Sequence, residues 1–226
     1  MSRFWPIATA LLGVATLVIL FAFSILPDVR AAYPNGDFAV ALNSFQHAAT
    51  PNDLDAVFGT PADPARLRAM TAGNTLDLFG FIPAYGLFLI AGIMLLGRRL
   101  KNPFALAAMA LAGIGLVGDI GETTRQLAMT TDWSHALSLL PIAPWCETKF
   151  FGLAGCALAI GAICFTSEHK RWILGALGVL PILVVSADAL HVLPAPALMT
   201  AAFGAFWVAL LVVGILETVR ARGASA

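Results

Sequence analysis

Charged residues are unusually few in this 226-residue chain. Asp, Glu, Lys and Arg make up 12% of it, whereas hydrophobic residues make up 59%. Acidic and basic residues number 13 each, and no Lys/Arg-rich tract is present to bind a phosphate backbone, which argues against a nucleic-acid partner. Together with a mean hydropathy of +0.86, so little charge excludes an ordinary water-soluble domain and predicts an integral membrane protein.

Cysteine is also scarce, and the common catalytic motifs are missing. Cys146, Cys156 and Cys164 all fall in one predicted helix, about 15 and 12 Å apart along its axis, so they cannot pair within the chain. No CxxC, P-loop, HExxH or GxSxG sequence occurs. We therefore interpret the three thiols as small buried hydrophobes.

Six apolar runs are long enough to cross a membrane, since a hydrocarbon core needs about 20 residues of helix. They are residues 4–26, 75–97, 104–124, 145–165, 172–193 and 197–216. Backbone amides find no partner in lipid, so the runs should be helices packed into one bundle. The prediction is an all-α, polytopic helical bundle that forms a single transmembrane domain over residues 1–226.

Lys and Arg indicate the orientation, because short cytoplasmic loops retain positive charge. With six spans, four basic clusters fall on one side of the membrane: Arg3, residues 98–101, residues 170–171 and residues 220–222. This predicts that both termini are inside. The first run can also be read as a secretory signal whose removal leaves five spans, but it is longer than the usual signal core of about 7 to 15 residues.

The connection over residues 27–74 is longer than an ordinary loop and should contain structure of its own. Residues 37–47 suit a short amphipathic helix, and Thr50-Pro51 is a typical helix start ahead of Leu54. Pro64 begins a third segment that leads into the second span. We predict a cap of two or three short helices on the outer side.

Most ionisable side chains inside the predicted spans fall toward this outer end. A charge in hydrocarbon costs about 2.5 to 3.5 kcal/mol on insertion scales, so intramembrane acids normally line a cavity or functional site. The candidate catalytic residues are therefore Asp77, Asp119, Glu122, Asp188 and His191. Asp119 and Glu122 are three residues apart and share a helix face, as do Asp188 and His191.

Around these acids we expect a substrate-binding wall formed by Asn74, Phe81, Tyr85, Arg125, Trp133, Trp145 and Glu147. A structural role is the alternative for the charged members, because Arg125 and Lys149 can form ion pairs that fix helix register. Glu147 and Lys149 are two residues apart and point in roughly opposite directions, so at most one of them faces the interior.

These features predict an enzyme of isomerase, cyclase or hydrolase type that uses acid/base chemistry on a lipid, sterol or isoprenoid-like substrate. Three other readings stay open: a non-catalytic membrane subunit, a transporter-like binding protein, and a carboxylate and histidine metal site. No cofactor is expected, although the last reading allows a divalent metal. Expected partners are membrane lipids, the hydrophobic substrate, and a second copy or another membrane subunit. The expected location is a bacterial inner membrane.

Overall fold

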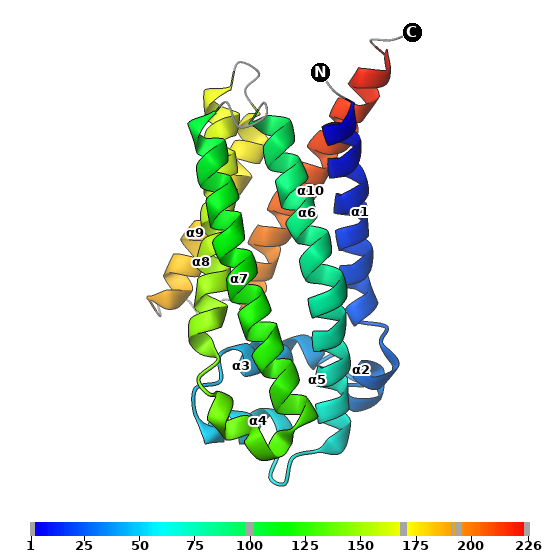
Figure 1. Ribbon diagram of the computed structural model, residues 1–226, viewed down its shortest axis with the longest axis vertical. Coiled ribbons are helices and arrows are strands. Elements are labelled where there is room, and N and C mark those ends of the chain that lie inside the picture. The colour runs from blue at the N-terminus through cyan, green and yellow to red at the C-terminus, as the bar shows by residue number, and fades with distance from the viewer. Residues whose placement is uncertain (1–2, 98–101, 168–170, 191, 193–195, 224–226) are drawn as a thin grey trace. The chain divides into compact units, whose positions relative to one another are not determined.

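The computed structural model describes residues 3–97, 102–167, 171–190, 192 and 196–223 (Figure 1). Within these ranges the chain is helical and contains no strand. The elements, in chain order, are α1 (Phe4–Phe23), α2 (Pro27–Ala32), α3 (Phe38–Gln46), α4 (Pro51–Phe58), α5 (Pro64–Leu76), η1 (Asp77–Phe81), α6 (Ile82–Leu96), α7 (Pro103–Thr131), η2 (Trp133–Leu139), α8 (Ala143–Thr166), α9 (Trp172–Ala189) and α10 (Pro196–Gly223).

Six helical stretches in this described part of the chain are long and apolar enough to cross a membrane. They are Phe4–Ala32, Pro64–Leu96, Pro103–Thr131, Ala143–Thr166, Trp172–Ala189 and Ala197–Gly223. This confirms the predicted all-α, polytopic helical class with six spans.

Several helices extend beyond the apolar runs that predict them. α7 continues to Thr131, although its apolar run ends near residue 124, and the second span starts at Pro64 rather than at residue 75. These added turns are less apolar, and they persist because residues such as Met70 and Met129 pack into a hydrophobic core with the neighbouring short helices. Asp119 consequently lies in the middle of a continuous helix and not at its end, which corrects the expectation from hydropathy.

A single π-helical turn, η1, interrupts the second span between α5 and α6. The N–H of Ile82 donates to the carbonyl of Asp77, five residues back. Pro83 follows, and in a regular α-helix its ring would clash with the carbonyl four residues earlier, so the wider turn accommodates it. Such turns occur often at functional positions, and this one begins at an intramembrane acid.

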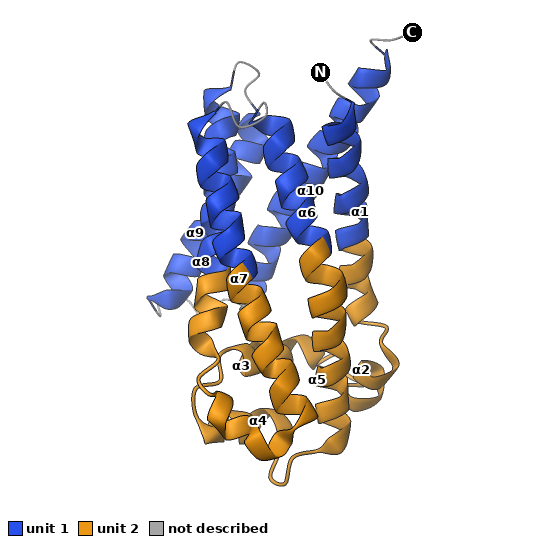
Figure 2. Cartoon of the chain, in the orientation of Figure 1, with its two compact units in different colours: residues 1–16, 84–116, 150–226 blue, residues 17–83, 117–149 orange. Residues whose placement is uncertain are grey.

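The chain divides into two compact units (Figure 2). Unit 1 comprises Met1–Thr16, Ala84–Leu116 and Phe150–Ala226, and unit 2 comprises Leu17–Pro83 and Val117–Lys149. Each unit is described separately below.

Small residues allow close helix packing in unit 1. A Cβ at Gly152 would collide with the backbone of Gly115, and a Cβ at Gly178 would collide with the carbonyl of Ala157. Glycine is therefore required where α8 meets α7 and where it meets α9, as at many interfaces between membrane helices.

Unit 2 contains the predicted cap, in which α2, α3 and α4 are short helices. Aromatic side chains form its centre: Phe45 packs edge-on against Phe58 with ring centroids 4.9 Å apart, and Phe58 packs against Trp133 at 4.9 Å. Phe45 and Phe58 are both fully buried. The prediction of short helices in the first long connection is confirmed, and Trp133 from η2 joins their core.

α7 and α8 also approach closely in unit 2. A Cβ at Gly118 would collide with the backbone nitrogen of Lys149, and a Cβ at Gly121 would collide with the ring of Trp145. The absence of side chains at these two positions lets the polar face of α7 lie directly against α8.

Candidate functional site: an acid and lysine cluster in unit 2

The centre of the site is one lysine ammonium shared by two carboxylates. Lys149 Nζ lies 3.1 Å from Asp119 Oδ1 and 3.0 Å from Glu122 Oε2. All three residues are buried, and Glu122 has no exposed surface. Because Asp119 and Glu122 are one turn apart on α7, both can reach the same ammonium group.

Asp77 extends this cluster from the π-helical turn. Its Oδ2 accepts a hydrogen bond of 3.0 Å from the hydroxyl of Thr123, which is buried on α7. Asp77 also lies within electrostatic range of Asp119, Lys149 and Glu122. Asp77 as a whole residue is partly exposed, whereas Asp119 and Glu122 are buried.

Two buried amides lie on the helices that carry the acids. Gln126 Nε2 donates to Glu122 Oε1 at 3.4 Å, one turn along α7. Asn74, one turn before Asp77, is 2% exposed, and its Nδ2 makes no hydrogen bond within the described residues. Buried polar groups are nearly always satisfied, so the Asn74 amide has a hydrogen bond left to donate to a water molecule or another polar partner.

The formal charges of the cluster do not balance. Three carboxylates and one ammonium leave a charge of −2 when every group is ionised. An isolated charge within the bilayer is costly, so the excess requires protons or bound cations. A group of acids that holds protons in common has the composition that acid/base chemistry requires.

Arg125 is not the cation that neutralises Glu122, contrary to one sequence-based alternative. Its Nη1 donates to the carbonyl of Leu139 at 3.1 Å, and its guanidinium lies 5.3 Å from the centre of the Trp145 ring. Lys149 takes the role instead. Glu147 is exposed while Lys149 is buried, which confirms that only one of these two residues faces the interior.

The remaining expected site residues are distributed over both units. Phe81 lies in unit 2, where its ring packs edge-on against Phe23 with centroids 5.8 Å apart. Tyr85 belongs to unit 1, is fully buried, and stacks on Trp207 at 5.4 Å. Asp188 is a partly buried residue near the end of α9 in unit 1. His191 lies outside the described residues, so its pairing with Asp188 stays a prediction.

Lys149 is the functional residue that sequence reasoning undervalued. Its spacing from Glu147 showed that one of the two had to face inward, but not which one. Gly118 and Gly121 are the residues that could have decided between them, since they lie on the side of α7 that contacts α8. Lys149 lies on α8 directly opposite Gly118.

A separate cavity of about 370 Å³ lies in the cap of unit 2. Its polar lining includes Tyr33, Asp37, Ser44 and Arg66. Burial raises the pKa of Tyr33, partly offset by the Arg66 charge. Among the described residues, no group of three or more His, Cys, Asp or Glu side chains has the geometry of a metal site.

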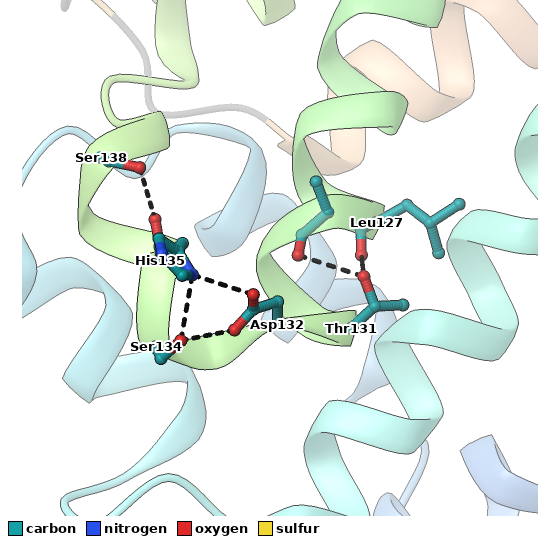
Figure 3. A network of polar contacts seen from close by, with 7 residues as sticks. Leu127, Thr131, Asp132, Ser134, His135 and Ser138 are labelled. Atoms are coloured by element: carbon teal, nitrogen blue, oxygen red, sulfur yellow. Dashed lines mark hydrogen bonds and ion pairs between the residues drawn. The ribbon is translucent and has the colours of Figure 1, made fainter.

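An exposed polar network follows the end of α7 (Figure 3). Asp132 accepts hydrogen bonds from the Ser134 hydroxyl at 2.6 Å and from His135 Nδ1 at 2.9 Å, and these bonds hold the pKa of the Asp132 carboxyl below its ordinary value. His135 is exposed. This network stabilises the turn into η2.

Comparison of the chain with protein-family models, with characterised proteins and with solved structures finds no match.

Proposed function

We propose that the acid and lysine cluster is an acid/base site of a membrane enzyme whose substrate is a lipid, sterol or isoprenoid-like molecule. The observation that carries this proposal is the shared ammonium: Lys149 holds Asp119 and Glu122 together within membrane-spanning helices, and Asp77 adds a third acid. A substrate that reaches an acid at this depth has to be largely apolar.

In this proposal Asp77 exchanges the proton with the substrate, because it is the partly exposed acid. Lys149 balances the charge that remains on Asp119 and Glu122 when a proton leaves the cluster. Asn74 supplies an amide donor that can orient a polar group of the substrate. General acid/base catalysis of this kind contributes a factor of about 100 to 10,000 in rate.

The proposal extends to the protein's surroundings. We place it in a bacterial inner membrane with both termini inside, with membrane lipids and a hydrophobic substrate as its partners. We propose that the site uses no cofactor and that bound protons balance the excess negative charge of the cluster; a divalent cation is the alternative way to balance it.

The test is a comparison of lipid extracts by mass spectrometry from cells that express the wild type, Asp77→Asn or Glu122→Gln. We expect the wild type to deplete one lipid class and enrich another. Each substitution should lower the conversion by about 100-fold or more, because a carboxamide cannot transfer the proton. Asp55→Asn in α4 is the control, since it also removes one acid from unit 2 but at an exposed position of the cap.

Thermal unfolding in detergent must show that the substituted proteins are folded. Unchanged lipids in cells that express the wild type, relative to cells without the protein, would reject the enzymatic proposal. Full conversion by folded Asp77→Asn would reject the role of Asp77.

A further inference from the structure

The cavity in the cap of unit 2, called here the cap cavity, shares no lining residue with the acid and lysine cluster. Its volume of about 370 Å³ falls within the range of about 300 to 1,000 Å³ that is usual for ligand sites. The connection between α2 and α3 forms one wall, and α3, α4 and α5 form the others. The polar residues of the lining are Tyr33, Asn35, Asp37, Ser44 and Arg66.

The Tyr33 hydroxyl is a buried polar group that lacks a partner. It makes no hydrogen bond with any described residue, although a buried phenol usually finds one. The residue itself is held in place, since its backbone N–H donates to the carbonyl of Val29 at 2.9 Å and its ring packs against Phe38 with centroids 5.5 Å apart. Because Tyr33 lines the cap cavity, a molecule bound there can supply the missing partner.

Arg66 adds a guanidinium to the same lining. Its Nη1 donates to the carbonyl of Val57 at 2.9 Å, which fixes the side chain and uses one of its five N–H groups. Asp63 Oδ2 lies 3.9 Å from Arg66 Nε, which is too far for a hydrogen bond. The Arg66 charge acts on the Tyr33 hydroxyl, since it partly offsets the rise that burial causes in the pKa of Tyr33. The remaining N–H groups of Arg66 suit the paired oxygens of a phosphate.

Asp37 gives the lining a negative charge. It precedes α3 as the N-cap residue, but its carboxylate makes no hydrogen bond to the start of that helix. Among the described lining residues, one acid and one base leave no net charge. Asp37 repels an anion and Arg66 repels a cation, whereas a molecule that carries both charges can pair with both residues.

The cap cavity forms next to the ends of two spanning stretches. Tyr33 directly follows the first stretch that is long and apolar enough to cross a membrane, Phe4–Ala32, and Arg66 lies near the start of the second, Pro64–Leu96. We therefore expect both side chains at the level of the lipid headgroups, where tyrosine and arginine are common. A phospholipid can place its headgroup in a cavity at this level while its acyl chains stay in the bilayer.

We propose that the cap cavity binds the phosphoethanolamine headgroup of a membrane phospholipid. The phosphate oxygens accept hydrogen bonds from Arg66 and from the Tyr33 hydroxyl, and the ammonium group donates to the Asp37 carboxylate. No covalent bond forms or breaks, so the cap cavity is a recognition site. The acid and lysine cluster takes no part in this binding, so the two proposals can fail independently.

The experiment titrates the full-length protein in a neutral detergent with dihexanoyl phospholipids that carry phosphoethanolamine, phosphocholine or phosphoglycerol, and follows the thermal midpoint. Equal acyl chains partition alike into the detergent, so a difference in affinity reports the headgroup. We expect the phosphoethanolamine lipid to bind about 10-fold more tightly than the other two. Phosphocholine has no N–H to donate to Asp37, and phosphoglycerol has no positive charge.

Substitutions in the lining separate the individual contacts. Arg66→Gln should weaken the binding by about 10-fold or more, and Tyr33→Phe by about 5-fold, because each removes donors to the phosphate. Asp37→Asn should abolish the preference for phosphoethanolamine over phosphoglycerol. Arg68→Gln is the matched control, since Arg68 is an exposed arginine two residues further along α5 that does not line the cap cavity.

Tyr33→Phe keeps the proposal testable if Arg66→Gln does not fold. It removes only a buried hydroxyl that lacks a partner, so the thermal midpoint without lipid should not fall. Absent binding, equal affinity for the three lipids, or unchanged affinity in folded Tyr33→Phe would each overturn the proposal. Glycerophosphoethanolamine, the same headgroup without acyl chains, should bind more weakly than the lipid. Equal affinity would overturn the lipid as the source and assign the site to a soluble phosphoethanolamine compound.

Discussion

Lys149 supplies the positive charge that the buried carboxylates of the cluster need. Its ammonium is the cation within 3.1 Å of Asp119 and Glu122, and all three groups are shielded from solvent. Removal of one member of a buried ion pair leaves an uncompensated charge, which costs far more than the pair contributes while intact. The charge of the lysine therefore stabilises the folded protein.

We expect Lys149→Met to lower the free energy of unfolding by about 3 to 5 kcal/mol, because it leaves two buried carboxylates without a cation. Replacing all three groups together, as Asp119→Asn, Glu122→Gln and Lys149→Met, should restore most of the lost free energy of unfolding. None of these three positions then carries a buried charge. Unfolding in detergent with increasing denaturant measures both effects. If the triple variant is as unstable as Lys149→Met, the packing of the lysine stem matters and not the charge.

The sequence alone could predict part of this cluster. Asp119 and Glu122 share a face because they are three residues apart, and the cost of burying them already marked them as functional candidates. Lys149 could not be assigned in the same way, because its partner depends on how α8 is rotated against α7. That rotation follows from packing at Gly118 and Gly121, which helical spacing does not reveal.

At the scale of elements, α4 illustrates a helix whose start is fixed by local bonds. Asp53 accepts hydrogen bonds from the backbone N–H groups of Ala49 and Thr50 and from the Thr50 hydroxyl, at 3.0, 2.8 and 2.8 Å. These bonds lower the pKa of the Asp53 carboxyl in the folded protein, with the Ala49 bond the largest cause. The ionised carboxylate therefore stabilises the folded cap.

A lowered folded-state pKa contributes stability above the ordinary value of 3.8, and this contribution disappears as the pH falls through the folded value. Asp53→Asn should thus lower the thermal midpoint at pH 7, and the difference from wild type should shrink steadily below pH 3.8. Asp55→Asn, an exposed substitution in the same helix, serves as the control. A difference that is the same at pH 7 and pH 3 would show that the Asp53 charge is not the cause.

Hydropathy predicts that the spanning helices exist but not where each of them begins and ends. Hydropathy located each of the six apolar stretches, because a run of about 20 consecutive apolar residues is as long as the hydrocarbon core requires. It did not find the continuation of α7 to Thr131, and the confirmed start of α5 at Pro64 was predicted from the proline and not from hydropathy. Those turns are held by contacts in the cap core, which form only after distant segments have come together.

At the scale of the whole molecule, the described helices keep many large apolar side chains exposed, including Leu11, Val18, Phe21, Ile173 and Leu183. Exposure of this extent is suited to lipid and not to water. The basic clusters at residues 98–101, 170–171 and 220–222 then predict that their side of the membrane faces the cytoplasm.

We expect alkaline phosphatase fused after residue 62, within the cap, to be active in the periplasm of a bacterial host, because the cap follows one outward-going span. The same enzyme fused after residue 223 should be inactive, because six spans return the chain to the cytoplasm. Fluorescent protein fusions at the same sites should give the opposite pattern. An active enzyme at residue 223 would contradict the inward C-terminus.

The π-helical turn gives the second span a freedom that a regular helix does not have. Pro83 cannot donate a hydrogen bond, so the carbonyls just before it are released from the usual backbone ladder. If the acid/base proposal holds, a change in the winding of this turn would move the Asp77 carboxylate relative to the Thr123 hydroxyl without moving the whole span. Asp77 would then be the acid that carries a proton between the buried carboxylates and the substrate.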